Sequence, residues 1–407
     1  MPTYLYRVRD TAGKLVKGHM DAVSEAELAG KLQKMGYVVT KITEGHVGIK
    51  MEGLAELADR FKRIRTEDKI MFNIQLANMI DSGIPLLSSL KTLKDQIENN
   101  KLKEILGDVY RSIDGGGSFS EAIAKHPNIF SKLFVSMVKA GEVSGSLPTV
   151  LNRGAVFAEH QADIRQRING ALFYPLILII TAIGVTTFIV TFVMPNFIRI
   201  FKGAGVALPL PTMILYGIGL GVKKYWWIIL LGIIFIGFGI KIYIGTERGR
   251  LQFDRLKLNF PIIGSLARKL YISRFARTLA TMIASGVPIL QSLNLAGEVV
   301  GNEVIARVIK STRDGVEEGE AIAESLKISG EFPADMIQMV AVGEETGNLE
   351  GLLNKISDFY DMAVDYSIRK LTALLEPVFL LIIGCIVAFI MASMLLPIFD
   401  MMKALQH

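Results

Sequence analysis

The sequence is poor in the residues that most often build reactive centres. Cys385 is the single cysteine among 407 residues, so no disulfide framework holds this fold. Motifs of the types G-x-x-x-x-G-K-[ST], H-E-x-x-H, C-x-x-C and G-x-S-x-G are also lacking. The histidines are scattered without the spacing of metal ligands, so we expect them on the surface; they are His19, His46, His126, His160 and His407. We therefore expect no catalytic, cofactor-binding or metal site, and a protein that is not an enzyme.

The sequence also lacks a secretory signal and a nucleic-acid-binding pattern. The opening MPTYLYRVRDTAGKLVKGH carries charges where a signal peptide needs an apolar run, so we expect the N-terminus in the cytoplasm. The formal net charge is +6, but no arginine-rich run is interleaved with aromatic residues. We expect the basic residues to face anionic lipid at a membrane surface, and no nucleic acid.

Long apolar runs are present, and three of them are predicted to cross a membrane. Residues 171–194 and 377–399 carry no charge and exceed the roughly 20 residues that a spanning helix needs. A shorter uncharged run, 225–240, has an aromatic start and flanking lysines that can reach the membrane surface, so we place the second span at 225–244. Prolines and glycines between the first two spans predict a loop over 195–224 with an interfacial lead-in to the second span, and the glycine runs GAG at 203–205 and GIGLG at 217–221 are interpreted as loop and close helix packing.

The lysines and arginines near these runs predict the orientation of the chain. Basic residues crowd the segments before span one, after span two and before span three. The loop 195–224 holds four basic residues and the tail after span three holds only Lys403. The positive-inside rule then places the N-terminus in the cytoplasm, and the loop and the C-terminus on the opposite side of a membrane that the chain crosses three times.

A stretch of the chain is written twice. SGIPLLSSL at 82–90 returns as SGVPILQSL at 285–293, and MVKAGEVSGSLPTVLN from Met137 returns as MVAVGEETGNLEGLLN from Met339. Both copies are followed by an apolar run, so they are parallel repeats. The unduplicated second span is the return helix that such an arrangement requires.

These patterns predict a mainly α-helical protein. The expected parts are a small ββαβ unit at 1–44, a linker with an amphipathic helix at 45–65, cytoplasmic helical bundles at 66–170 and 247–370, and the three spans with the periplasmic loop between the first two. The last helix of each bundle, from near Ser146 and Asn348, is expected to continue into its span. Pro175 and Pro377 should kink these helices near the membrane surface.

Paired turn motifs supply the candidate sites. The S-G-x-P corners predict that one helix ends at glycine and the next begins at proline, at Gly83 with Pro85 and at Gly286 with Pro288. The G-E-x-x-G-x-L turns have glycines that permit a positive φ or a close approach; they are Gly141, Gly145, Gly343 and Gly347.

Charged residues recur at matching places in the two copies. For Glu142 and Glu344, inside the G-E-x-x-G-x-L turns, a solvated carboxylate is the first interpretation, and a partner contact or internal salt bridge is the second. Asp163 with Arg167, and Asp365 with Arg369, stand four residues apart on predicted helices. They are expected to form the same intrahelical pair in both copies, which would stabilise the last helix of each bundle, here called its stem.

The duplicated S-G-x-P-x-L-x-S-L corner, the paired G-E-x-x-G-x-L turns, LPLPT at 208–212 and the Y-x-Y-x-x-x-D-x-x-G-K opening resemble the GspF/PilC family. Members of this family are inner-membrane platform proteins of type II secretion systems and type IV pili. The resemblance implies a scaffold that contacts a hexameric cytoplasmic ATPase, a pilin or pseudopilin and other inner-membrane assembly proteins. It also implies a homo-oligomer that couples the ATPase to extraction of subunits into a filament. Together with the orientation above, the resemblance places this multi-pass protein in a bacterial inner membrane, with its C-terminus in the periplasm.

Two other functions remain open from sequence. A small secondary transporter can be built from parallel repeats, but most of each repeat is predicted to lie outside the membrane and no span carries a charge in its middle. A membrane sensor without a mechanical role is the other alternative, and association with an ATPase and a pilin would separate it from a platform protein.

Overall fold

The computed structural model describes residues 3–9, 15–22, 24–44, 64–203, 209–261 and 263–404. By its contacts the chain divides into two compact units, one of residues 1–65 with 90–110 and one of residues 66–89 with 111–407. The linker helix expected at 45–65 falls mostly outside the described residues and stays a prediction.

The N-terminal part of the first unit is a three-stranded antiparallel sheet with one helix. The strands β1 (Thr3–Arg9), β2 (Leu15–Asp21) and β3 (Val38–Glu44) lie in the order β2-β1-β3, and α1 (Glu25–Lys34) separates β2 from β3. The Ser24 hydroxyl accepts the backbone N–H of Glu27 at 3.3 Å and so caps α1. Tyr4, Val8, Leu28 and Leu32 form the small core between helix and sheet. The predicted ββαβ order is confirmed.

The duplicated sequence folds into the same order of helices twice. The first copy gives α3 (Thr66–Asp81), α4 (Leu86–Gln96), α5 (Asn100–Asp114), α6 (Phe119–Ala124), α7 (Lys132–Ser144) and α8 (Leu147–Phe188). The second copy gives α12 (Ile263–Ala284), α13 (Ile289–Val299), α14 (Glu303–Glu317), α15 (Ile322–Ile328), α16 (Ala334–Glu345) and α17 (Leu349–Ala404). An additional helix, α11 (Glu247–Asn259), precedes the second copy. The mainly α-helical fold with an internal repeat is confirmed.

Both copies bury aromatic rings at matching places. Phe72 and Phe130 meet edge to face with ring centroids 6.1 Å apart, and their counterparts Phe275 and Phe332 lie 5.5 Å apart. Phe275 is completely buried in a core made by helices α12 to α17. The shared phenylalanines therefore set the same helix packing in each copy.

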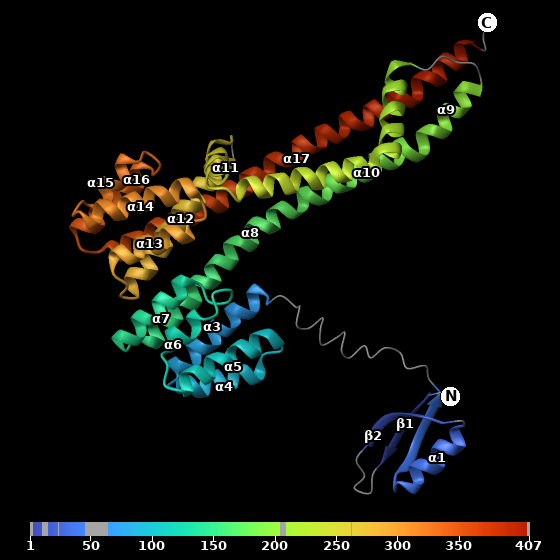
Figure 1. Ribbon diagram of the computed structural model, residues 1–407. Helices are drawn as coiled ribbons and strands as arrows, with labels where there is room; N and C mark the ends of the chain where they lie inside the picture. The colour runs from blue at the N-terminus through green and yellow to red at the C-terminus, as the bar shows by residue number, and fades with distance from the viewer. Residues whose placement is uncertain are drawn as a thin grey trace. The chain divides into compact units, whose positions relative to one another are not determined.

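Three of the described helices are long and apolar enough to cross a membrane. The first is 147–201, in which α8 continues through a π-helical segment η1 (Ile189–Val193) into α9 (Met194–Gly203). The second is α10 (Leu210–Ile244), and the third is 349–399 within α17. The stems of α8 and α17 run from the bundles into these apolar segments without interruption, as predicted (Figure 1). Both helices pass through their prolines, Pro175 and Pro377, and the kinks expected there remain predictions.

The loop predicted at 195–224 is wrong. Residues 194–203 form α9, and α10 already begins at Leu210, so the second long helix starts well before the predicted 225. Pro209 caps α10 and Pro211 lies in its first turn, where a missing N–H costs nothing. The glycine runs were interpreted as loop and close helix packing, and Gly219 lies inside α10, where a Cβ would come within 2.7 Å of the Val190 backbone oxygen. This glycine serves close helix packing.

The apolar helices meet at the end remote from the bundles. Val190, Met194, Leu215 and Ile390 are buried together there, and contacts join α10 both to η1 and to α17. Figure 1 shows α10 bending between its first part, which takes part in this cluster, and its second part. Large apolar side chains of α10, such as Trp226 and Phe235, are exposed and fit a lipid surround.

Candidate functional site at the junction of the two repeats

The S-G-x-P corners join α3 to α4 and α12 to α13. Gly83 and Gly286 adopt left-handed backbone conformations with φ of 84° and 78°. The amide after each glycine reaches back to the helix, from Ile84 to the Met79 oxygen at 3.0 Å and from Val287 to the Met282 oxygen at 3.1 Å. Pro85 and Pro288 stand directly before α4 and α13. The predicted helix–glycine–proline–helix corner is confirmed in both copies.

The G-E-x-x-G-x-L turns use their two glycines in different ways. Gly145 and Gly347 both have φ of 69°, which ends one helix and aims the next. Gly141 and Gly343 are helical residues instead, and permit a close approach: a Cβ on Gly141 would lie 3.1 Å from Val150, and one on Gly343 would lie 3.1 Å from Leu349. Each long stem therefore starts pressed against the helix before it.

Glu142 and Glu344 have the same role in the two copies. That role is neither a solvated carboxylate nor a partner contact or salt bridge, the two interpretations drawn from the sequence. The Glu142 carboxylate accepts the backbone N–H groups of Phe119 and Ser120 at 2.5 and 3.1 Å. The Glu344 carboxylate accepts those of Ile322 and Ala323 at 2.6 and 2.9 Å. Each glutamate thus caps the N-terminus of a neighbouring short helix, where a negative charge is stabilised. The expectation of a solvated carboxylate is wrong.

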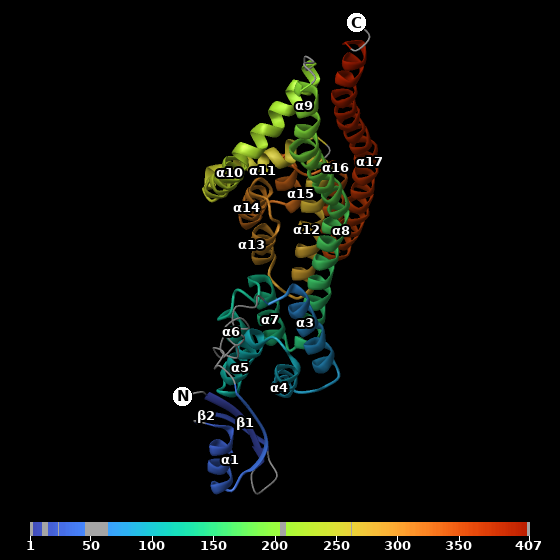
Figure 2. The same ribbon diagram turned by 90° about the vertical axis from the view of Figure 1, so that its right-hand side faces the viewer.

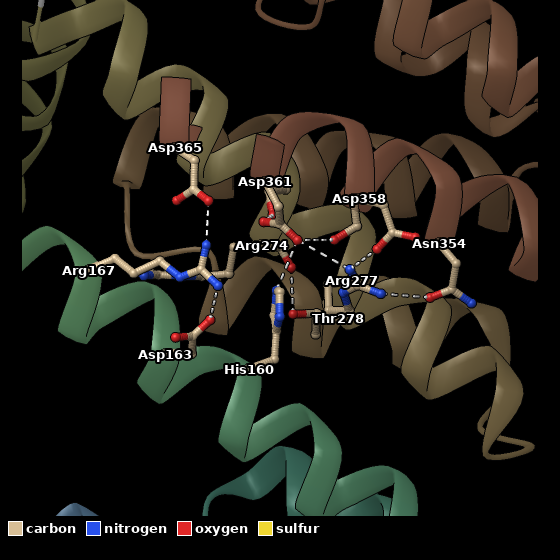
Figure 3. Close-up of polar contacts among 12 residues, drawn as sticks. His160, Asp163, Arg167, Arg274, Arg277, Thr278, Asn354, Asp358, Asp361 and Asp365 are labelled. Carbon is tan, nitrogen blue, oxygen red and sulfur yellow. Dashed lines mark hydrogen bonds and ion pairs between the residues drawn. The ribbon is translucent and has the colours of Figure 1, made fainter. Parts of the chain in front are cut away.

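Only one of the two expected intrahelical stem pairs forms. Arg167 contacts Asp163 four residues earlier at 2.7 Å, as predicted. Asp365 does not pair with Arg369; it pairs with Arg167 of the other copy. Figure 3 shows the Arg167 guanidinium between Asp163 and Asp365. The stems α8 and α17 are close enough here that Asp365 reaches Arg167, which already contacts Asp163. The contact between Arg167 and Asp365 therefore bridges α8 and α17.

A second polar cluster, which we call the stem network, lies further from the apolar segments. Arg277 of α12 donates to Asp358, to Asp361 at 3.2 Å and to Asn354 at 3.3 Å, all on α17. The buried hydroxyl of Ser273 donates to the same Asp361 carboxylate. These contacts bind the first helix of the second copy to its stem (Figure 3).

His160 extends the stem network to the first copy. Its Nε2 lies 3.0 Å from Asp361 Oδ2, an ion-pair distance. Burial raises the pKa of Asp361, but the neighbouring His160, Ser273 and Arg277 outweigh burial and leave that pKa below its ordinary value. His160 was expected on the surface; its side chain is only 25% exposed.

The network contains serine, histidine and aspartate, yet its geometry differs from that of a catalytic triad. In a triad the imidazole stands between the two others and takes the proton of the serine. Here Asp361 stands in the middle, and the Ser273 hydroxyl donates to its carboxylate. Nothing in this arrangement activates the serine as a nucleophile. Among the described residues no cluster of three His, Cys, Asp or Glu side chains could hold a metal ion.

Further contacts join the two copies on either side of these polar groups. The two copies share one buried apolar cluster. It contains Leu133, Met137 and Val150 of the first copy and Met282, Val287 and Leu295 of the second. At the rim Lys132 contacts Glu298 at 3.0 Å. The copies therefore meet through an apolar core and a polar border, and Figure 2 shows the α8 and α17 stems running beside each other.

Sequence reasoning missed the stem network, although the repeat contained a signal for it. Aligning the copies puts Arg277 opposite Ile74, Ser273 opposite Ile70 and Asp358 opposite Val156. Polar residues thus replace apolar ones on matching faces of two related helices. Such a difference marks a place where the copies have acquired different partners.

Comparison with known proteins agrees with the duplicated fold. The sequence matches the family described as type II secretion system (T2SS), protein F, over residues 72–195 and again over 275–397. Residues 1–43 match the type II secretion system protein F, N-terminal domain.

Several curated proteins are similar over nearly their whole length. A type IV pilus assembly protein PilC of Thermus thermophilus is 37% identical over 406 residues, covering 100% of this chain and 99% of the relative. The PilC of Myxococcus xanthus is 34% identical, covering 99% and 96%. A type II secretion system protein F of Vibrio cholerae is 30% identical, covering 98% of each chain.

Proposed function

The chain belongs to the family of type II secretion system protein F, and from this premise we propose that it is the inner-membrane platform of a filament-assembly machine. Relatives named for type IV pilus assembly and for type II secretion support this proposal. The observation that carries it is structural: two related helical bundles each continue into a long apolar helix, and one return helix joins them. We place the protein in pilus assembly first, because the pilus relatives reported above are more similar than the secretion relative.

The proposed platform works by transmitting movement and has no chemistry of its own. Its bundles would contact a hexameric cytoplasmic ATPase, and its apolar helices would contact pilin or pseudopilin helices and other inner-membrane assembly proteins. A homo-oligomer would give the ATPase more than one bundle to engage. Continuous helices support this role, because a rotation of either bundle is carried along α8 or α17 into the membrane.

The partner assignment is tested in a strain that lacks this protein. We expect restored surface filaments when the full chain is supplied, and co-purification with the assembly ATPase and the pilin. The purified protein alone should hydrolyse no ATP and should change the turnover of the cognate ATPase. ATP hydrolysis by the protein itself, after contaminants are removed, would contradict a passive platform.

The proposed orientation has its own test. We propose a cytoplasmic N-terminus and a periplasmic C-terminus, supported by the basic residues before 171, after 244 and before 377. A reporter that is active only outside the cytoplasm should be active when fused after residue 205 or at His407. It should be silent after residue 150 or 300. Activity at residue 300 would show that α10 does not return the chain to the cytoplasm.

A further inference from the structure

The two copies differ most clearly in a cavity that one of them keeps open. A pocket of about 590 Å³ lies between α3 and α8 of the first copy, and Arg274 and Val299 of the second copy close it. Its apolar wall includes the rings of Phe130, Phe134 and Phe157. The pocket therefore lies at the junction of the copies.

The second copy shows how the same space looks when it is filled. Ala158 lines the cavity in the first copy, and its counterpart in the second copy is Tyr360, which is buried with its hydroxyl 3.2 Å from Asp335. Lys69 and Asn73 line the cavity opposite Ala158, and their counterparts Ile272 and Ala276 are completely buried. The first copy thus lacks the aromatic side chain that fills this space in the second copy, and it has polar wall residues where the second copy has apolar ones.

The charged residues of the cavity wall all carry the same sign. They are Lys69, Arg165 and Arg274, and no aspartate or glutamate is among the described residues that line the pocket. Arg274 donates to the Val300 backbone oxygen at 3.2 Å, and its Nε is buried without a hydrogen-bond partner. Asn73 Oδ1, in the same wall, is likewise buried without one.

The two arginines are close enough to repel each other. Burial lowers the pKa of Arg274, and the nearby charge of Arg165 acts in the same direction. Within the described part of the chain no carboxylate forms an ion pair with either guanidinium. An anion entering the cavity would therefore offset the cost of burying the charge of Arg274 and would reduce the repulsion between Arg274 and Arg165.

We propose that this cavity binds a phosphate-bearing anion with an apolar body. Two guanidinium groups suit a phosphate, which offers several oxygens and more charge than one carboxylate. The phenylalanine rings suit the apolar body. Arg165 lies six residues before the predicted start of the first span at 171, about 9 Å along the helix axis, so the phosphate of a membrane lipid could reach the site as readily as a soluble phosphate ester.

A bound phosphate would join the two copies. Arg165 comes from α8 of the first copy and Arg274 from α12 of the second, so one anion contacting both adds a further bridge to the ion pairs that already join the copies. This inference is independent of the proposed function, because binding is measured on the purified chain without an ATPase or a pilin.

The test compares two phosphate sources on the full chain in neutral detergent. Retention of phosphatidylglycerol over phosphatidylcholine probes the lipid source, and calorimetric titration with phenyl phosphate, compared with phenol as its neutral control, probes the soluble one. We expect wild type to prefer at least one phosphate anion over its neutral control about tenfold, the effect of one charge-assisted hydrogen bond. Arg165→Gln and Arg274→Gln should each remove most of that preference.

Two further variants make the result decisive. Ala158→Phe supplies the ring of Tyr360 without its hydroxyl and should abolish binding by filling the cavity, with both arginines intact. Arg369→Gln removes an exposed stem cation outside the cavity and should bind as wild type. Arg165 is exposed, so its variant is informative even if Arg274→Gln fails to fold. No preference for either anion, or an equal loss in Arg369→Gln, would overturn the proposal.

Discussion

Replacing Gly347 or Gly145 with valine should abolish filament assembly while the protein remains in the membrane at near-normal abundance. Both glycines have φ of 69°, and no atom lies within 4 Å of a Cβ built on either of them. Valine would therefore suffer backbone strain without a clash, a cost of roughly 1–2 kcal/mol. That cost is small enough for a membrane-anchored bundle to survive. The cheapest relief is a change of the turn, which would re-aim the stem that follows.

Asparagine supplies the matched control, because it adopts the left-handed conformation far more readily than valine. Gly347→Asn and Gly145→Asn should keep both abundance and surface filaments. Membrane abundance by immunoblot and filaments by shearing would be measured in the same cells. If abundance falls in step with filaments in the valine variants, the turn serves folding alone and the transmission argument fails.

These turns could be predicted from sequence because their signal is local. A glycine that ends a helix and a proline that precedes the next one are constrained by the backbone of the same few residues. Gly83 and Gly286 accordingly behave as predicted, and the duplication provided a second, independent instance of each motif.

The start of α10 was mispredicted because proline and glycine have more than one use. Pro211 was taken to break a helix, but in a first turn it costs no hydrogen bond. The glycine run around Gly219 was assigned to close helix packing as well as to a loop, but the residue it packs against, Val190, is far away in sequence. Only knowledge of which helices touch could have distinguished the two uses.

Long-range partners explain the other misses as well. Glu344 takes its partners from the start of α15, and Asp365 takes Arg167 from the opposite stem. Spacing along one helix predicts pairs within that helix. It carries no information about a competing partner on another copy, which is why the second stem pair was assigned to the wrong arginine.

The stem network leads to the second large expected effect. Asp361→Leu should lower the free energy of unfolding by about 2–3 kcal/mol, somewhat less than the loss of a partner in a fully buried pair, because the Asp361 side chain is 18% exposed. The change leaves the Arg277 guanidinium and the buried Ser273 hydroxyl without their shared acceptor. Thermal unfolding in detergent would measure the loss.

Asp358→Leu is the matched control, since Asp358 contacts the same Arg277 but its side chain is 64% exposed. A surface pair of this kind contributes about 0–1 kcal/mol, so this variant should unfold close to wild type. If the two substitutions lower the free energy of unfolding equally, any carboxylate near Arg277 stabilises the fold to the same extent. The additional contacts of Asp361 then contribute nothing measurable.

The dependence on pH identifies the carboxylate itself. The pKa of Asp361 is lower in the folded protein than its ordinary value, so its ionised form stabilises the fold, and that stabilisation is present above the ordinary pKa of about 3.9. It should disappear as the pH falls through the lower folded pKa, where wild type and Asp361→Asn become alike. The unfolding midpoints of the two proteins should therefore differ most near neutrality and converge in acid. A difference that stays constant down to acid would mean that Asp361 stabilises the junction by packing, and that its contact with His160 does not use the negative charge.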